Sequence, residues 1–143
     1  MRALLDVNVL IALLDANHVH HARAAEWLGE HIGRGWASCP LTQIGCIRIM
    51  SQPAYPNAQP AALVASRLQS ATDAHHHAFW AADVDALAKA QIAWDRILST
   101  RHATDVYLLA LAVAHGGCFV TFDQHVPTVA IAAAKARHLV VLD

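Results

Sequence analysis

The sequence predicts an α/β fold, a three-layer sandwich in which helices cover both faces of a mostly parallel central sheet of about five strands. Short apolar runs alternate along the chain with segments of helical periodicity. The apolar runs are continuous, which is typical of strands buried on both faces. Hydrophobic residues make up 56% of the 143 positions, enough material for one core. We therefore expect a single domain over residues 1–143.

The first strand and helix follow one another directly. Residues 2–5 form an apolar run, and residues 9–14 form an apolar helix for which Asp6 and Asn8 are good capping residues. Asp6 is then placed at the carboxyl end of the first strand. An amphipathic helix is expected next, over residues 19–33.

The second strand and its helix lie in the next part of the chain. Residues 36–39 are apolar, and Pro40 is suited to the first position of a helix over 41–50. Residues 51–60 contain three prolines and predict a loop, which a helix over 61–71 follows.

The remaining elements are two further strand and helix units and a last strand. Residues 78–81 predict a strand, and residues 83–98 predict a helix capped by Asp83 or Asp85. Thr104 and Asp105 head an apolar helix that ends before two glycines. The final expected strands are residues 118–122 and 138–143.

Three aspartates mark the ends of these elements. Asp6 follows the first strand, Asp123 follows the fourth, and Asp105 begins the helix that leads into the fourth strand. Any one of them alone is most simply read as a cap or turn residue. Together they are expected at one edge of the sheet, where their mutual repulsion requires a cation. Oxygen ligands of this kind suit Mg²⁺, with Mn²⁺ as a substitute.

The composition limits the partners and the compartment. A formal net charge of -1 excludes the broad basic surface that drives non-specific nucleic-acid binding. Three widely spaced cysteines predict reduced, buried thiols. No segment reaches the roughly 18 consecutive apolar residues of a membrane span, and the amino-terminal residues include several polar ones, so we expect a cytoplasmic protein with no membrane partner.

Several segments together resemble a known family. Residues 4–14 ("LLDVNVLIALL"), 39–53 ("CPLTQIGCIRIMSQP"), 77–80 ("HAFW"), 104–117 ("TDVYLLALAVAHGG") and 120–123 ("VTFD") look like the PIN-domain ribonucleases that serve as toxins of VapBC toxin–antitoxin modules. The resemblance covers nearly the whole chain in the right order. It implies a Mg²⁺-dependent endoribonuclease that cuts tRNA or rRNA and is neutralised by a VapB-type antitoxin.

The resemblance also assigns site residues. The acidic positions of the family, which would bind the metal and act in catalysis, fall on Asp6, Asp105 and Asp123. A further acid, usually glutamate, falls where this chain has Gln43, which carries no negative charge. One firmly held ion is therefore expected rather than two.

Other residues are expected to support this site. Asn8, Gln43, Thr104 and Thr121 are predicted beside the carboxylates, with Thr104 as a helix cap. Arg48 is predicted to contact an RNA phosphate or an antitoxin carboxylate. The apolar faces of 41–50 and 61–71 are expected to pack in a homodimer or an antitoxin groove.

Two alternatives remain open at this point. A PIN-like binding module with weak or no catalysis is consistent with Gln43. A phospho-receiver domain also gathers aspartates around Mg²⁺, but it needs a lysine at the end of a late strand, and none lies near Asp123.

Overall fold

A computed structural model describes residues 1–89 and 91–143 and contains one five-stranded sheet in the order β3-β2-β1-β4-β5. All neighbouring strands are parallel, as predicted. The strands are β1 (Ala3–Leu5), β2 (Trp36–Ser38), β3 (His77–Phe79), β4 (Cys118–Thr121) and β5 (Leu139–Val141).

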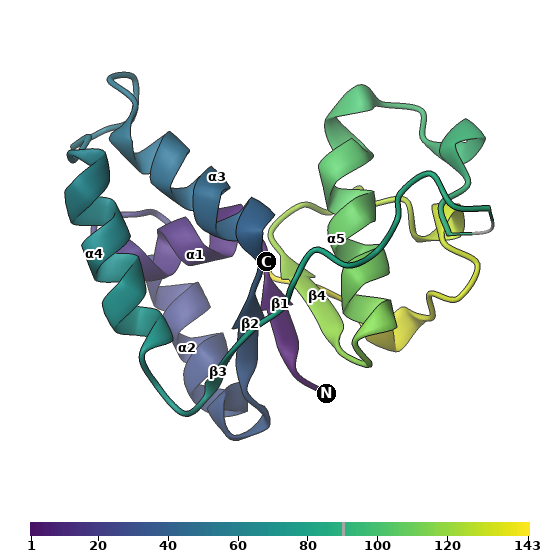
Figure 1. Ribbon diagram of the computed structural model, residues 1–143. Helices are drawn as coiled ribbons and strands as arrows, with labels where there is room; N and C mark the ends of the chain where they lie inside the picture. Colours follow the sequence, from purple (N-terminus) through teal and green to yellow (C-terminus); the bar gives the residue numbers. More distant parts are fainter. Residues whose placement is uncertain (90) are drawn as a thin grey trace.

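Helices lie on both faces of this sheet, so the predicted three layers are confirmed. Figure 1 shows the first four helices on one side and α5 on the other. The helices are α1 (Val7–Leu14), α2 (His21–His31), α3 (Pro40–Ser51), α4 (Ala61–Thr72) and α5 (Ala103–Ala114). Short 3-10 turns cover Ile32–Arg34, Trp94–Arg96, Thr100–His102, Thr128–Ala130 and Ala136–His138.

Alternate residues of the central strands build two separate cores. Leu5 and Val120 pack with α1 to α4, whereas Leu4 and Phe119 pack with α5. Successive side chains of a strand point to opposite faces, so continuously apolar strands supply both cores at once. This is the physical reason for the unbroken apolar runs in the sequence.

The predicted helix over residues 83–98 is wrong. The described residues 83–89 and 91–98 form turns and the single 3-10 turn Trp94–Arg96, while residue 90 lies outside the described residues. The Asp85 carboxylate accepts the backbone N–H of Leu87 at 2.9 Å and so closes a turn instead of capping a helix. Leu87 is 86% exposed and Leu98 97% exposed, so these apolar side chains do not pack against the sheet. Without such packing, a short helix is only marginally stable.

Two other expectations concern cysteines and membranes. All three cysteines are buried and unpaired, as predicted. Within the described ranges, no helix has the length and apolar character needed to cross a bilayer.

Gly117 is predicted to be essential for the close approach of β1 and β4. A methyl group there would overlap the carbonyl oxygen of Arg2 and the ring of Trp80. We expect Gly117→Ala to lower the free energy of unfolding by about 1–3 kcal/mol, because backbone cannot yield as a flexible side chain does. Urea denaturation measures this change.

Gly29→Ala is the matched control for that substitution. Gly29 lies inside α2, and a Cβ there meets nothing within 4 Å. We expect it to stabilise the protein by about 0.5–1 kcal/mol through helix propensity. Equal effects of the two substitutions would contradict the packing described here.

Candidate metal centre

The predicted aspartates lie at the carboxyl edge of the sheet. Asp6 follows β1 and is the N-cap of α1, where its Oδ1 accepts the Val7 N–H at 2.7 Å. Asp123 follows β4, and Asp105 lies in the first turn of α5. Because β1 and β4 pair in parallel, with Leu5 opposite Val120, their carboxyl ends lie side by side.

Thr121 joins the two strand ends. Its hydroxyl donates to Asp6 Oδ2 at 2.6 Å and accepts the backbone N–H of Asp123 at 3.0 Å. The Thr121 side chain is fully buried, so these bonds are shielded from water. They fix the rotamer of Asp6 and the start of the turn that carries Asp123.

Asn8 completes this connection through Thr121 and the backbone, without a hydrogen bond of its own to a carboxylate among the described residues. The Asn8 amide donates to Thr121 Oγ1 at 3.3 Å, and its oxygen accepts the backbone N–H of Phe122 at 3.3 Å. The side chain therefore ties the first turn of α1 to the segment after β4. Asp6, whose carboxylate has about four lone-pair positions, keeps free positions after its two hydrogen bonds.

A group of possible metal ligands lies beside Asp6. One donor atom from each of His102, Asp105 and Asp123 lies within 4.8 Å of the others. Nδ1 of His102 is 3.6 Å from Oδ2 of Asp105 and 3.8 Å from Oδ2 of Asp123. Asp6 is not a member of this tight group, although it is close enough to affect the charge of Asp105.

His102 was not predicted from the sequence. It ends the turn Thr100–His102 and is the N-cap of α5, three residues before Asp105. Side chains three apart lie on the same face of a helix, so this spacing was the available signal. The chain has 11 histidines, and the spacing alone does not distinguish His102 from the others.

The electrostatics of the group favour a bound cation. Burial, followed by the negative charges of Asp6 and Asp123, raises the pKa of Asp105 to about 7. Burial also raises the pKa of Asp6, although hydrogen bonds from Thr121 and Val7 act in the opposite direction. A divalent ion would relieve this repulsion.

The residues present fit such an ion. Carboxylate oxygens are the ligands that hard divalent ions prefer. Within the described part of the chain, His102 Nδ1 is also a buried atom that lacks a hydrogen-bond partner. An ion bound among these side chains would neutralise the carboxylates and would give His102 Nδ1 a partner.

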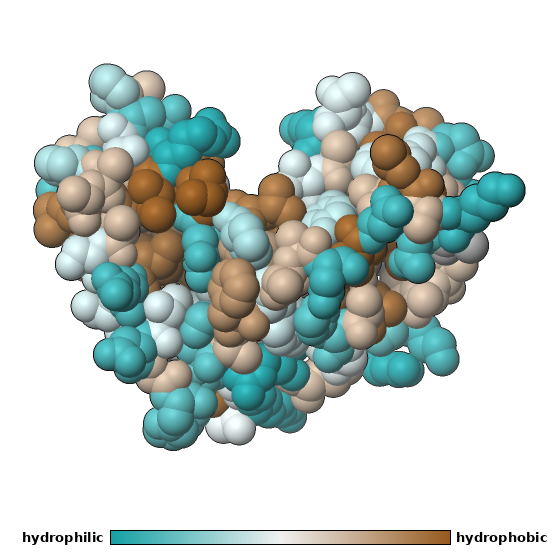
Figure 2. All heavy atoms as spheres, in the orientation of Figure 1, coloured by the Kyte–Doolittle hydropathy of each residue, from teal (hydrophilic) through white to brown (hydrophobic). Residues whose placement is uncertain are grey.

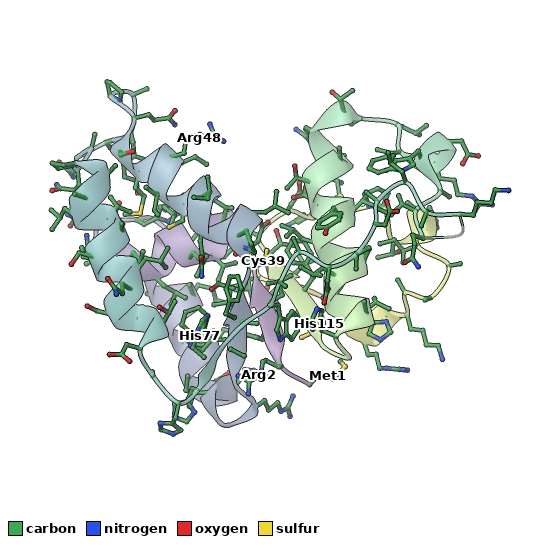
Figure 3. The ribbon with its side chains drawn as sticks, in the orientation of Figure 1. Met1, Arg2, Cys39, Arg48, His77 and His115 are labelled. Carbon is green, nitrogen blue, oxygen red and sulfur yellow. The ribbon has the colours of Figure 1, made fainter. Side chains whose placement is uncertain are left out.

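A cleft leads to the carboxylates. It has a volume of about 570 Å³ and is lined by Asp6 and Asp105 together with Val7, Pro40, Leu41, Ile44, Gly45, Arg48, Ile49 and Thr104. Figure 2 shows the notch between the α3 side and the α5 side of the molecule, with hydrophobic residues on the α3 wall. Arg48 projects from α3 beside this notch (Figure 3).

Two predicted supporting residues lie differently from the expectation. Thr104 lines the cleft, but it is inside α5 and does not cap it; the cap is His102. The Gln43 amide donates to Ser38 Oγ at 2.9 Å, and Ser38 Oγ is 2.8 Å from His77 Nε2. Among the described residues no hydrogen bond joins Gln43 to the three aspartates, because its side chain is held toward β2 and β3.

The chain matches the PIN domain family over residues 3–132. Ribonuclease VapC44 of Mycobacterium tuberculosis is 50% identical over 142 residues, which cover 99% of this chain and 100% of that protein. Ribonuclease VapC39 of the same organism is 41% identical over 124 residues, which cover 86% of this chain and 89% of that protein.

Solved structures share the fold. The crystal structure of VapBC2 from Rickettsia felis bound to a promoter DNA fragment has a TM-score of 0.66 at 12% identity, with 100% of both chains covered. VapC20 of Mycobacterium tuberculosis, a Sarcin–Ricin loop cleaving toxin, has a TM-score of 0.59 at 14% identity, with 93% of this chain and 98% of that chain covered.

The parallel sheet, with its carboxylates gathered beyond one edge, is accordingly that of a PIN domain, and the chain belongs to that family. Within the family, whole-chain identity to its relatives makes it a member of the VapC ribonucleases. The resemblance found in the sequence is thereby confirmed.

Thr121→Val tests the link between the strand ends. The substitution keeps the shape of the side chain but removes the hydroxyl. We expect about tenfold weaker divalent-ion binding and a loss of about 1–3 kcal/mol in the free energy of unfolding, because Asp6 loses a donor and the Asp123 N–H loses its acceptor. Calorimetric titration with Mn²⁺ and urea denaturation measure the two effects. Thr121→Ser keeps the hydroxyl and should keep most of both properties; a valine variant equal to wild type would contradict this role.

Proposed function

We propose that this protein is a Mg²⁺-dependent endoribonuclease that acts on tRNA or rRNA as the toxin of a type II toxin–antitoxin module, with Mn²⁺ able to replace Mg²⁺. The observation that carries the proposal is the convergence of Asp105 and Asp123 beside Asp6, with Asp6 and Asp105 lining an open cleft. The family to which the chain belongs supports it, since its relatives are ribonucleases. The proposed place of action is the cytoplasm, where these RNAs are found.

The proposed roles follow from the geometry. Asp6, Asp105 and Asp123 would hold the ion, which when bound supplies charge stabilisation at the scissile phosphate and a more acidic water. The side chain of Asp123 is 25% exposed, against 16% for Asp105, so Asp123 is the carboxylate placed to accept a hydrogen bond from the attacking water. Attack of water at phosphorus would break the bond between phosphorus and the 3′ oxygen. That oxygen takes up a proton and becomes a 3′-hydroxyl, and the phosphate stays on the 5′ oxygen of the other fragment.

The cleft wall supplies the rest of the substrate site. Arg48 is exposed on α3 and borders the cleft, where a guanidinium is suited to hold a phosphate. A nearly neutral protein would thus hold a polyanion locally, through Arg48 and the bound ion.

The same wall is the proposed docking site of a VapB-type antitoxin. Leu41 and Ile44 line the cleft with 41% and 63% of their surface exposed. An apolar segment that covers them, with an acidic side chain on Arg48, would exclude RNA. Leu63 on α4 is also exposed, at 45%, and we propose that part of this apolar surface packs in a homodimer.

RNA cleavage by matched variants tests the proposed function. Pure wild type, Asp6→Asn and Asp123→Asn are incubated with tRNA and rRNA pools in Mg²⁺ or Mn²⁺, and the new ends are sequenced. Cleavage by wild type alone is expected. Equal cleavage by all three would identify a contaminant, and no cleavage by wild type would favour the RNA-binding module without catalysis.

Gln43 is the observation that favours this second candidate, and Gln43→Glu tests it. Restoring an acid is expected to tighten Mg²⁺ binding and speed cleavage by about tenfold, provided that the new carboxylate leaves Ser38 and turns toward the aspartates, where it adds negative charge. The competing partner is the Ser38 hydroxyl, which now accepts from the Gln43 amide and can donate to the new carboxylate. Gln69→Glu, which adds the same charge on the exposed surface of α4, is the control. A wild type without activity that gains it through Gln43→Glu would establish the inactive-module reading.

A further inference from the structure

His102 carries a buried nitrogen that nothing in the described part of the chain satisfies. Its side chain is 8% exposed, and Nδ1 has no hydrogen-bond partner among the described residues. The two carboxylate oxygens that face it, at 3.6 and 3.8 Å, lie beyond the range of a good hydrogen bond. A buried polar atom left unpaired lowers the stability of the folded state, so a ligand at this nitrogen would offset a cost of its burial.

The spacing of these three atoms is that of ligands around one ion. Ligands bound at about 2.1 Å lie roughly 3–4 Å from one another in tetrahedral or octahedral shells. The separations of 3.6 and 3.8 Å from Nδ1 to the Asp105 and Asp123 oxygens fall in that range. Small side-chain movements therefore suffice to close a shell made of one nitrogen and two oxygens.

We propose that His102 binds the metal through Nδ1, together with Asp105 and Asp123, and that this nitrogen makes the centre select transition-series divalent ions over Mg²⁺. The proposal rests on the proposed function, because it concerns the ion of the same centre. Imidazole nitrogen is a good ligand for first-row transition ions, whereas Mg²⁺ prefers oxygen ligands and retained waters.

The position of His102 supports a ligand role over a purely structural one. It sits at the N-terminus of α5, three residues before Asp105, so both side chains project from adjacent turns of one rigid element. Asp123 comes from the turn after β4, where its backbone N–H is fixed by Thr121 at 3.0 Å. Donors held in this way lose little freedom when they bind an ion.

Pulsed electron paramagnetic resonance of bound Mn²⁺ tests the proposal directly. The full chain is loaded with one equivalent of Mn²⁺, and the spectrum is searched for coupling to a directly bound nitrogen. Wild type is expected to show that coupling, and labelling histidine with ¹⁵N should change it. His102→Gln should abolish it. His125→Gln should retain it, because the exposed His125 contacts Asp123 through its backbone N–H.

Calorimetric titration with Co²⁺, Mn²⁺ and Mg²⁺ gives the selectivity. We expect His102→Gln to weaken Co²⁺ and Mn²⁺ binding by about tenfold or more and Mg²⁺ binding much less. Bound Mn²⁺ without nitrogen coupling in wild type, or coupling that His125→Gln removes, would overturn the proposal and leave the proposed function intact. Failure of every divalent ion to bind wild type would overturn both. If His102→Gln does not fold, the wild-type spectrum with ¹⁵N-histidine decides alone.

Discussion

Asp105→Asn is expected to lower the rate of RNA cleavage by about 10³-fold or more in saturating Mg²⁺, measured under single-turnover conditions. Asparagine has nearly the same shape, but it brings no negative charge to the ion. The donor group that includes Asp105 also contains Asp123 and His102, so the loss removes a member of the tightest cluster. Asp95→Asn, at an exposed position in the 3-10 turn Trp94–Arg96, is the control and should cleave like wild type.

The Asp105→Asn protein is expected to stay folded. In the absence of metal, burial and the charges of Asp6 and Asp123 disfavour the ionised form of Asp105. A neutral asparagine therefore removes an electrostatic cost from the folded state. A circular dichroism melt in EDTA should show a midpoint at or above that of wild type. Retention of more than a tenth of the wild-type cleavage rate would contradict a metal-binding role for Asp105.

Removal of the metal is the second large effect. In excess EDTA, cleavage by wild type is expected to fall by about 10³-fold or more and to return when Mn²⁺ or Mg²⁺ is added in excess. The protein should remain folded, because both cores consist of apolar side chains that pack against one another and include no metal ligand. Gel assays and melts on the same samples measure the two properties. Cleavage that is unaffected by EDTA would contradict the account.

The stability of the metal-free protein is expected to depend on pH through Asp105. An ordinary aspartate releases its proton near pH 3.8, whereas in the folded chain Asp105 holds its proton until about pH 7. Its contribution to stability is therefore fully present below about pH 4 and is lost as the pH rises through about 7. With allowance for solvent screening of this partly exposed group, the loss is about 1–2 kcal/mol.

Comparison with Asp105→Asn isolates that contribution. In EDTA, the variant should gain about 1–2 kcal/mol relative to wild type between pH 5 and pH 8, measured by urea denaturation. Saturating Mn²⁺ should abolish or reverse the difference, because the ion binds the deprotonated carboxylate of wild type. A difference that does not change with pH in EDTA would show that Asp105 titrates as an ordinary surface carboxyl.

Most of the fold was predictable because its strands and helices have clear patterns. The continuous apolar runs around Leu4 and Phe119 reflect strands that supply two cores at once. Pro40 begins α3 as predicted, and Thr42 accepts the Cys39 N–H at 3.0 Å to complete that start. The prediction that Asp6 and Asp123 share one edge of the sheet followed from parallel strands, whereas the direct pairing of β1 with β4 is seen only in the fold.

The wrong or missing predictions concern residues whose structure depends on tertiary contacts, which the spacing of apolar residues in the sequence does not reveal. Residues 83–98 have an apolar pattern with helical spacing, but Leu87 and Leu98 remain exposed because the chain there runs beside α5 without a sheet face to cover. Gln43 was expected near the carboxylates, yet its direction depends on Ser38, a partner that only the fold reveals. Likewise, His102 at the end of the turn before α5 and Asp123 in the turn after β4 lie close together only through the fold.

Anomalous diffraction at the manganese edge, from crystals of the full chain soaked in Mn²⁺, tests most directly whether these acids form a metal centre. The account predicts one strong peak within about 2.5 Å of carboxylate oxygens of Asp105 and Asp123, on the side that Asp6 faces. Absence of a peak between these side chains, or carboxylates spread too widely to reach one ion, would contradict it.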